Sequence, residues 1–224
     1  MMEDARAYEE LRVGFTAAVS HELRTPLARL LAILESAELP GADRDALLAE
    51  AREQVEEMSE LIDDVLFLSE LESGRQVVAL GVTPALPVLE ETRDRLADSA
   101  ERADVSIVID AAPDVVIPLR RRMLQVVAEN LALNSIRYAG PGATLLLAAR
   151  PGVLEVADDG RGVEKDELLR LFERFYRSDQ ARASRGTGLG LAIVKHVVAS
   201  AGGQVEASGG PGRGLRIVCS FPAP

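Results

Sequence analysis

One short run of the sequence combines a histidine, a carboxylate and a hydroxyl at a spacing that suits phosphoryl and proton transfer. The run is HELRTPL, residues 21–27, in which Glu22 directly follows His21 and Thr25 lies one helical turn later. A neutral imidazole is nucleophilic near pH 7, and the adjacent carboxylate can accept the proton that an attacking imidazole loses. A threonine four residues on can hold a water beside a modified ring. A histidine on a helix is usually an ordinary surface residue, so the run needs support from the rest of the chain.

A second candidate group lies on one helix near the middle of the chain. Residues 118–140 read PLRRRMLQVVAENLALNSIRYAG, which predicts a helix with Pro118 in its first turn and a glycine at its end. Asn130 and Asn134 are spaced by four and therefore share one stripe of this helix. Two asparagines in a helix rich in Leu and Val favour a ligand, and a side-chain carbonyl oxygen suits magnesium. The stripe also includes Tyr138, with Arg137 beside it.

Two glycine motifs follow, and a charged segment separates them. Asp158, Gly160 and Gly162 form D-x-G-x-G at the end of an expected strand, a pattern that simple turns also show. GTGLG, residues 186–190, opens an expected helix, where free backbone N–H groups can bind phosphate, although this motif is a frequent false positive. LFERFYRSD, residues 171–179, predicts a short amphipathic helix followed by a loop. Positive charge is concentrated in this segment and in the polar run that continues it, at Arg174, Arg177, Arg182 and Arg185.

The histidine run belongs to the first of two expected helices. Apolar positions between Val13 and Leu34 recur every three or four residues and predict one seam: Val13, Thr16, Ser20, Leu23, Leu27, Leu30 and Leu34. At about 100° per residue this seam points well away from His21, so we expect an exposed imidazole. After a break at residues 39–43, a second helix repeats the pattern at Leu47, Ala51, Gln54, Met58, Leu61, Val65 and Leu68. Such a hairpin buries little alone, which predicts a homodimer with a four-helix bundle.

Charge and composition divide the chain at the same point. The net charge of −11 is carried entirely by residues 1–75, whereas residues 76–224 are neutral. After residue 75, short β-like runs alternate with helices and predict an α/β sandwich. We therefore expect an α+β protein, with a helical hairpin over residues 1–75 and a sandwich domain over 76–224. Cys219, the one cysteine, lies in an apolar strand-like run and is expected in the core.

The bulk numbers also exclude some partners. Nucleic-acid binding depends on many cationic contacts to phosphate, so an acidic chain argues against a nucleic-acid partner. No apolar run approaches the roughly 18 residues that a membrane span requires, and the acidic first residues differ from a signal peptide. We expect the chain to be cytoplasmic, with membrane contact only through segments outside this chain.

Taken together, these motifs resemble one family. HELRTPL is similar to the phospho-acceptor box of bacterial sensor histidine kinases of two-component systems. The later segments resemble, in order, the family's asparagine box, first glycine box, ATP lid with its phenylalanine box, and second glycine box. The resemblance implies a HisKA-type hairpin and a HATPase-type domain that uses ATP and Mg²⁺ to phosphorylate His21. The phosphoryl group would then pass to an aspartate in the receiver domain of a response regulator, with Glu22 as the base and Thr25 supporting dephosphorylation of that partner.

The resemblance also implies roles in the nucleotide site. Asn134 would be the magnesium ligand, Asn130 a second metal contact, and Asp158 the acceptor for the adenine amino group. Related ATPases of the superfamily carry glutamate at the position of Asn130, where it activates water, and an amide cannot replace that base. Ser135 stands where the family often has alanine. The remaining implied nucleotide contacts are Arg137, Tyr138, Gly160, Gly162, Phe175, Gly186, Thr187, Gly188, Leu189 and Gly190.

Three alternatives stay open at this point. A superfamily ATPase that hydrolyses ATP or phosphorylates serine would share the nucleotide site but would have no reason to carry HELRTP. A protein that acts mainly as a phosphatase on its regulator is compatible with Thr25. A dimerisation scaffold without enzymatic activity would tolerate a decayed nucleotide site, whereas all four nucleotide segments here look intact.

Overall fold

The computed structural model describes residues 2–73, 81–178 and 186–222, with side chains from residue 16 onward. The chain divides into two compact units, Met1–Phe67 and Leu68–Pro224, and each is described by itself.

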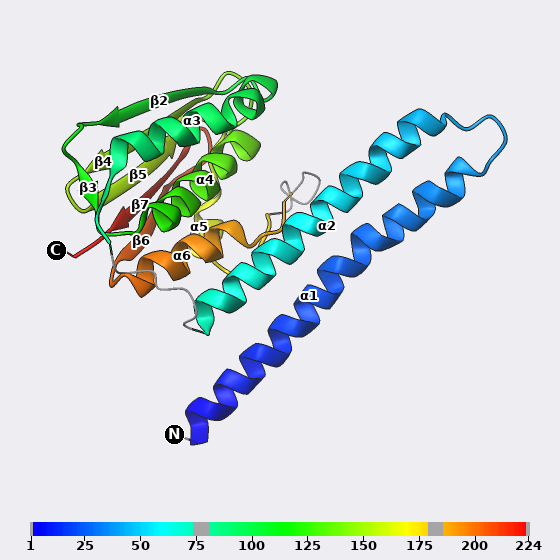
Figure 1. Ribbon diagram of the computed structural model, residues 1–224, viewed down its shortest axis with the longest axis horizontal. Helices are drawn as coiled ribbons and strands as arrows, with labels where there is room; N and C mark the ends of the chain where they lie inside the picture. The colour runs from blue at the N-terminus through cyan, green and yellow to red at the C-terminus, as the bar shows by residue number, and fades with distance from the viewer. Residues whose placement is uncertain (1, 74–80, 179–185, 223–224) are drawn as a thin grey trace. The chain divides into compact units, whose positions relative to one another are not determined.

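The first unit is a helical hairpin. Helix α1 (Met2–Ala37) and helix α2 (Arg44–Glu72) run in opposite directions and are joined by a short turn (Figure 1). The end of α2, from Leu68 onward, belongs to the second unit. Helix α1 continues through Pro26. The Asp43 carboxylate accepts a hydrogen bond from the Ala46 N–H at 3.1 Å and so caps the first turn of α2. The expected pair of helices is therefore present.

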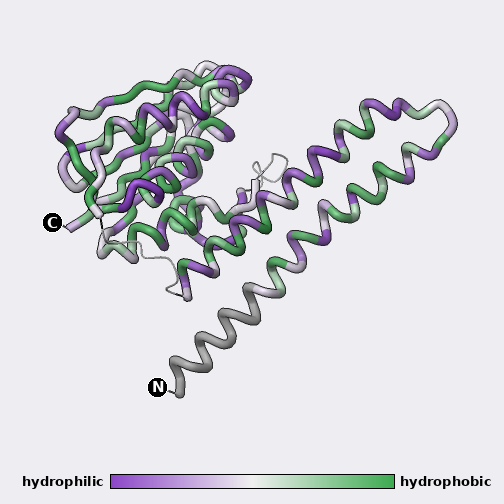
Figure 2. The backbone as a smooth tube through the Cα atoms, viewed as in Figure 1, coloured by the Kyte–Doolittle hydropathy of each residue, from purple (hydrophilic) through white to green (hydrophobic). Residues whose placement is uncertain are grey.

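The hairpin has apolar residues on more than one side. Figure 2 shows apolar and polar positions alternating along α2 and along the coloured part of α1. The predicted seam of α2 is buried or half-buried throughout. The single seam predicted for α1 is wrong, because Pro26 and Ile33 are buried while Leu27 and Leu34 are 55% and 48% exposed. A spacing of three and four residues fits either of two adjacent positions, such as Pro26 and Leu27, so it did not predict which of them is buried. Helices α1 and α2 carry the exposed apolar set of the hairpin, Leu27, Leu31, Leu34, Leu48, Val55, Ile62 and Leu66, and Leu39 in the turn between them is also exposed.

The second unit is built on a five-stranded sheet of order β2-β4-β5-β7-β6. The strands are β2 (Ser106–Ala111), β4 (Thr144–Arg150), β5 (Val153–Asp158), β6 (Gln204–Gly209) and β7 (Leu215–Ser220). Only the β2–β4 pair is parallel, and the other neighbours are antiparallel. A separate pair, β1 (Thr83–Pro84) with β3 (Val116–Ile117), lies outside this sheet.

Three helices cover one face of the sheet (Figure 1), and the core lies between them and the strands. They are α3 (Ala85–Arg102), α4 (Arg121–Tyr138) and α6 (Gly190–Ser200). Fully buried side chains from both layers include Leu124, Leu131, Leu147, Leu154 and Ile193. Cys219 on β7 is also buried, and burial raises the pKa of its thiol to about 12. The expectation that this cysteine is a core residue is confirmed.

Two local predictions are wrong. The helix expected from Pro118 begins at Arg121, because the chain leaves strand β3 at Ile117 and the Leu119 carbonyl accepts a hydrogen bond from the Thr83 hydroxyl at 2.6 Å. The short helix expected within residues 171–179 is absent, because residues 171–175 form turns; in the described part of this region, helix α5 covers Lys165–Leu168. Phe175 has a positive φ of 61°, which is incompatible with a continuing helix. Residues 179–185 lie outside the described residues.

Candidate active site

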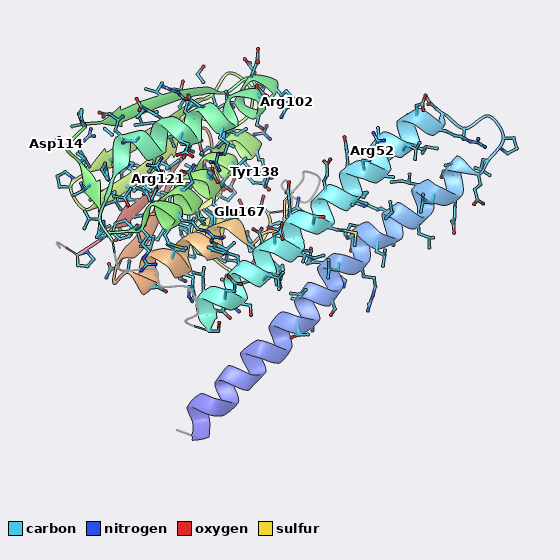
Figure 3. All side chains as sticks on the ribbon, in the orientation of Figure 1. Arg52, Arg102, Asp114, Arg121, Tyr138 and Glu167 are labelled. Carbon is cyan, nitrogen blue, oxygen red and sulfur yellow. The ribbon has the colours of Figure 1, made fainter. Side chains whose placement is uncertain are left out.

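The site is organised around the second half of α4. One side of this helix packs into the core through eight buried residues: Met123, Leu124, Val127, Ala128, Leu131, Ala132, Ser135 and Ile136. Asn130 and Asn134 lie beside that face and are half-buried. Figure 3 labels Arg121 and Tyr138, which mark the first and last residues of α4. The core therefore fixes the helix, and the two amides keep partial access to solvent.

The two asparagine amides differ in their partners. The Asn130 Nδ2 group donates to the Val126 carbonyl at 2.9 Å, so its Oδ1 atom is turned away from the helix backbone. A Cβ atom built on Gly190 would lie 2.5 Å from this Oδ1, which places the oxygen against the first residue of α6. Among the described residues, the Asn134 side chain has no hydrogen-bond partner. Both amides can therefore offer a carbonyl oxygen to a ligand.

These oxygens fit magnesium bound together with phosphate. Within residues 2–73, 81–178 and 186–222, no group of three or more His, Cys, Asp or Glu side chains is placed to hold a metal ion. Magnesium usually keeps several waters and takes few protein ligands, with substrate phosphates completing its octahedron. Asn134 and Asn130 suit that mode of binding, in which the nucleotide supplies the anionic ligands.

Asp158, the last residue of β5, is held by three hydrogen-bond donors. Its Oδ2 atom accepts from the Ser135 hydroxyl at 2.8 Å. Its Oδ1 atom accepts from the backbone N–H groups of Gly160 at 3.1 Å and Leu215 at 3.2 Å. Three hydrogen bonds hold the carboxylate in one orientation, in which it can accept a further hydrogen bond from an amino group of a ligand.

The glycine loop after Asp158 is attached on both sides. The Arg161 N–H donates to the Ala139 carbonyl at 2.9 Å, and a side chain at Gly160 would collide with Ala139. On the other side, the turn at residues 209–214 donates back to the loop, from Gly212 N to Arg161 O at 2.8 Å and from Gly214 N to Gly160 O at 3.0 Å. The sequence analysis did not identify this turn.

The second glycine motif meets both the asparagine helix and the phenylalanine segment. A Cβ atom on Gly186 would lie 3.3 Å from the Tyr138 hydroxyl and 3.4 Å from an Arg137 guanidinium nitrogen. The Phe175 N–H donates to the Gly188 carbonyl at 3.0 Å, and Gly188 leaves no room for a side chain against the Phe175 backbone. The Thr187 hydroxyl accepts from the Leu189 N–H at 3.2 Å, immediately before α6 begins. The segments singled out in the sequence therefore converge on α4.

The arginines of the 171–185 region are only partly described. Arg174 forms an ion pair with Glu72, and both residues belong to the second compact unit. Arg177 is half-buried, whereas Arg182 and Arg185 lie outside the described residues. A cation–π contact stabilises the turns at residues 171–175, because the Arg170 guanidinium lies 4.3 Å from the centroid of the Tyr176 ring.

The candidate acceptor lies on α1, in the first unit. His21 and Thr25 are exposed, Glu22 is half-buried, and Pro26 is buried against the hairpin. The predicted exposure of the imidazole is therefore confirmed, although the seam from which it was predicted is wrong. The helix presents the ring to solvent and holds Glu22 and Thr25 within one turn of it.

Two family sequence models match the chain. The model of the His Kinase A (phospho-acceptor) domain matches residues 11–74, and that of the histidine kinase-, DNA gyrase B-, and HSP90-like ATPases matches residues 120–224. Together the two matches cover most of the chain, with the exposed histidine in the first and the asparagine helix in the second. The chain belongs to the histidine kinases. The family expected from the motifs is thereby confirmed.

Individual kinases align over almost the whole chain. The sensor-like histidine kinase SenX3 of Mycolicibacterium smegmatis is 33% identical over 223 residues, which cover 96% of this chain and 58% of SenX3. The phosphate regulon sensor protein PhoR of Pseudomonas aeruginosa is 37% identical over 224 residues, which cover 95% of this chain and 50% of PhoR. The chain thus spans about half the length of the curated kinases it matches.

Solved kinase structures share the fold. The Acinetobacter baumannii histidine kinase AdeS superposes with a TM-score of 0.74 at 24% identity, covering 90% of this chain and 97% of AdeS. The histidine kinase ThkA, solved in complex with response regulator protein TrrA, gives a TM-score of 0.75 at 17% identity over 99% of this chain and 65% of ThkA. In the described part of this chain, no helix combines the length and apolar character needed to cross a membrane.

Proposed function

We propose that this chain is the catalytic core of a two-component sensor kinase that transfers the γ-phosphoryl group of ATP to His21. The observation that carries the proposal is the convergence of four nucleotide-type segments on α4, in a chain that also presents an exposed histidine on a helical hairpin. Family membership supports the same reaction. An ATPase that lacks a histidine acceptor would account for the converging nucleotide-type segments but not for the exposed histidine on the hairpin.

In the proposed nucleotide site, Asp158 accepts the adenine amino group and the glycine loop at residues 160–162 lets the backbone approach the base. Asn134, with Asn130 beside it, holds magnesium, which neutralises charge on the phosphate oxygens when it is bound. The backbone N–H groups at residues 186–190 and the start of α6 face the phosphates. Arg137, Tyr138 and Phe175 complete the enclosure, because all three lie against this glycine segment or next to it.

The transfer itself needs little covalent work from the protein. An imidazole nitrogen of His21 attacks the γ-phosphorus in line, the bond from that phosphorus to the ADP oxygen breaks, and the ring proton passes to Glu22. An asparagine at position 130 cannot activate a water molecule, which favours transfer to histidine over hydrolysis. The chain contributes mainly by holding the His21 imidazole and the γ-phosphoryl group in position to react.

The phosphoryl group then passes to an aspartate on a receiver domain. The exposed His21 is accessible to such a partner, and the acidic surface of residues 1–75 would attract a response regulator with basic groups around its site, mainly through the association rate. ATP and response regulators are both cytoplasmic, and we place this chain there. Thr25 supports a second activity, removal of phosphate from the regulator, because its hydroxyl is exposed one turn from His21.

The hairpin works as a homodimer in this proposal. The exposed apolar set of the hairpin includes Leu31, Leu66 and Val55 at 58%, 58% and 50% exposure, and a lone hairpin would leave all of it in water. Pairing two hairpins into a four-helix bundle covers these residues while His21 stays outside.

The proposal is tested by incubating the chain with radiolabelled ATP and Mg²⁺, alongside His21→Gln and Asn134→Ala variants. We expect label that is acid-labile and base-stable in the unaltered chain and absent from both variants. Label that survives the loss of His21 would refute the acceptor, and label that survives the loss of Asn134 would refute the magnesium ligand.

A further inference from the structure

Ser135 carries a buried hydroxyl in an unusual arrangement. It is only 4% exposed and lies on the core face of α4, directly after Asn134. A serine or threonine within a helix commonly donates to the carbonyl four residues earlier, as Thr92 does to Val88 at 2.8 Å in α3. Ser135 instead donates across the core to Asp158 Oδ2, also at 2.8 Å. The hydroxyl thus connects the asparagine helix to the end of β5.

This bond determines which carboxylate oxygen is left for a ligand. Asp158 Oδ1 already accepts two backbone N–H groups, from Gly160 and Leu215, whereas Oδ2 accepts only the Ser135 hydroxyl among the described residues. A carboxylate oxygen accepts about two hydrogen bonds. The free capacity is therefore on Oδ2, the same atom that Ser135 holds.

We propose that Ser135 is a positioning residue that sets nucleobase selectivity by fixing Asp158 Oδ2 as the acceptor for the 6-amino group of adenine. This inference rests on the proposed function and extends it to a residue where the implied family pattern has alanine. Guanine carries an oxygen at the same position, and a carboxylate held by three donors can neither rotate away from that oxygen nor donate to it.

Loss of the hydroxyl leaves Asp158 in place but less constrained. In Ser135→Ala the two backbone donors still hold Oδ1, so the carboxylate remains and can turn about its last torsion. The 6-amino group then meets a mobile acceptor. Alanine is a good helix former, and α4 is packed on both sides of the substitution, so we expect the fold to persist.

The test is a binding cycle that removes the hydroxyl and the 6-amino group separately and together. The full chain and Ser135→Ala are titrated by calorimetry, with Mg²⁺ present, against ATP, GTP and purine riboside triphosphate, which lacks the amino group. We expect Ser135→Ala to lower the affinity for ATP about tenfold, which is typical of losing a hydrogen bond to a charged group. The affinity for the purine analogue should change by less than about threefold. The preference for ATP over GTP should fall in the same proportion as the affinity for ATP.

Two further variants separate this role from a purely structural one. Thr92→Val removes another buried helix hydroxyl, away from the site, and should leave all three affinities unchanged. Ser135→Cys keeps the side-chain shape with a weaker donor and should lie between serine and alanine. If Ser135→Ala lowers the affinities for ATP and for the purine analogue equally, or lowers neither, the inference is overturned while the proposed function stands. If the unaltered chain binds no ATP, the proposed function fails and this inference fails with it.

Discussion

The turn that closes the proposed adenine site can be tested with two neighbouring glycines of the same backbone conformation. Gly212 and Gly214 have φ angles of 68° and 70° and lie in the turn between β6 and β7. A Cβ atom on Gly212 would meet nothing within 4 Å, whereas one on Gly214 would overlap the backbone carbonyl oxygen of Asp158. Substitution by alanine at each position therefore separates the cost of a positive φ from the cost of the overlap.

The expected magnitudes differ enough to measure. Gly212→Ala carries only the positive-φ penalty and should lower the free energy of unfolding of the second unit by about 1 kcal/mol. Gly214→Ala must also push the turn away from β5. That movement breaks the bond from Gly214 N to Gly160 O, at 3.0 Å, and the bond from Leu215 N to the Asp158 carboxylate, at 3.2 Å. Losing one neutral and one charge-assisted bond adds roughly 3 kcal/mol.

The assay is urea unfolding followed by circular dichroism, with hydrogen exchange in β5 and β7 assigning the transition to the second unit. ATP affinity measured on the same samples should fall about tenfold or more in Gly214→Ala, because Asp158 loses a donor, and should stay unchanged in Gly212→Ala. Equal stabilities for the two variants would refute the tight approach of the turn to Asp158. A stable Gly214→Ala chain with full ATP affinity would refute the role of this turn in the site.

Three further predictions concern other parts of the molecule. Leu31→Glu should turn the expected dimer into a monomer in sedimentation analysis, whereas Leu169→Glu, at a residue 87% exposed in the second unit, should leave the mass unchanged; a dimer that survives Leu31→Glu would contradict the proposed bundle. Asp43→Ala should lower the stability of the hairpin by about 1 kcal/mol in thermal unfolding through loss of the α2 cap, and Asp45→Ala serves as the control without that bond. Because burial raises the pKa of Cys219 from 9.0 to about 12, its neutral thiol stabilises the fold fully below pH 9 and loses that contribution between pH 9 and about 12. Cys219→Val should therefore flatten the fall in stability over this window, and an unchanged pH profile would contradict the burial of the thiol.

The sequence predicted the elements whose signals are local. The exposure of His21 is confirmed, although the α1 seam from which it was predicted is wrong. The apolar seam of the second helix, from Leu47 to Leu68, follows from helical periodicity, and the structure confirms it. Asn130 and Asn134 were found for the same reason, because a spacing of four residues fixes a shared stripe without any tertiary information.

Features that depend on contacts between distant segments could not be predicted in this way. Ser135 was read as a minor departure from a family pattern, and its importance appears only through its bond to Asp158, 23 residues away. The turn at residues 209–214 gains its role from hydrogen bonds to a loop some 50 residues earlier. Phe175 ended a predicted helix because its N–H bonds to Gly188 instead of continuing the helix. In each case a contact between segments that are distant in the sequence decides the outcome, and the local sequence pattern does not specify that contact.

The most direct test of the central claim is to locate the phosphoryl group on the chain itself. After incubation with ATP and Mg²⁺ at neutral pH, peptides prepared without acid are sequenced by electron-transfer mass spectrometry. The account predicts phosphorylation on the imidazole of His21 and on no other residue. Phosphate on the other histidine of the chain, His196, on a serine or on a threonine, with His21 unmodified, would contradict it.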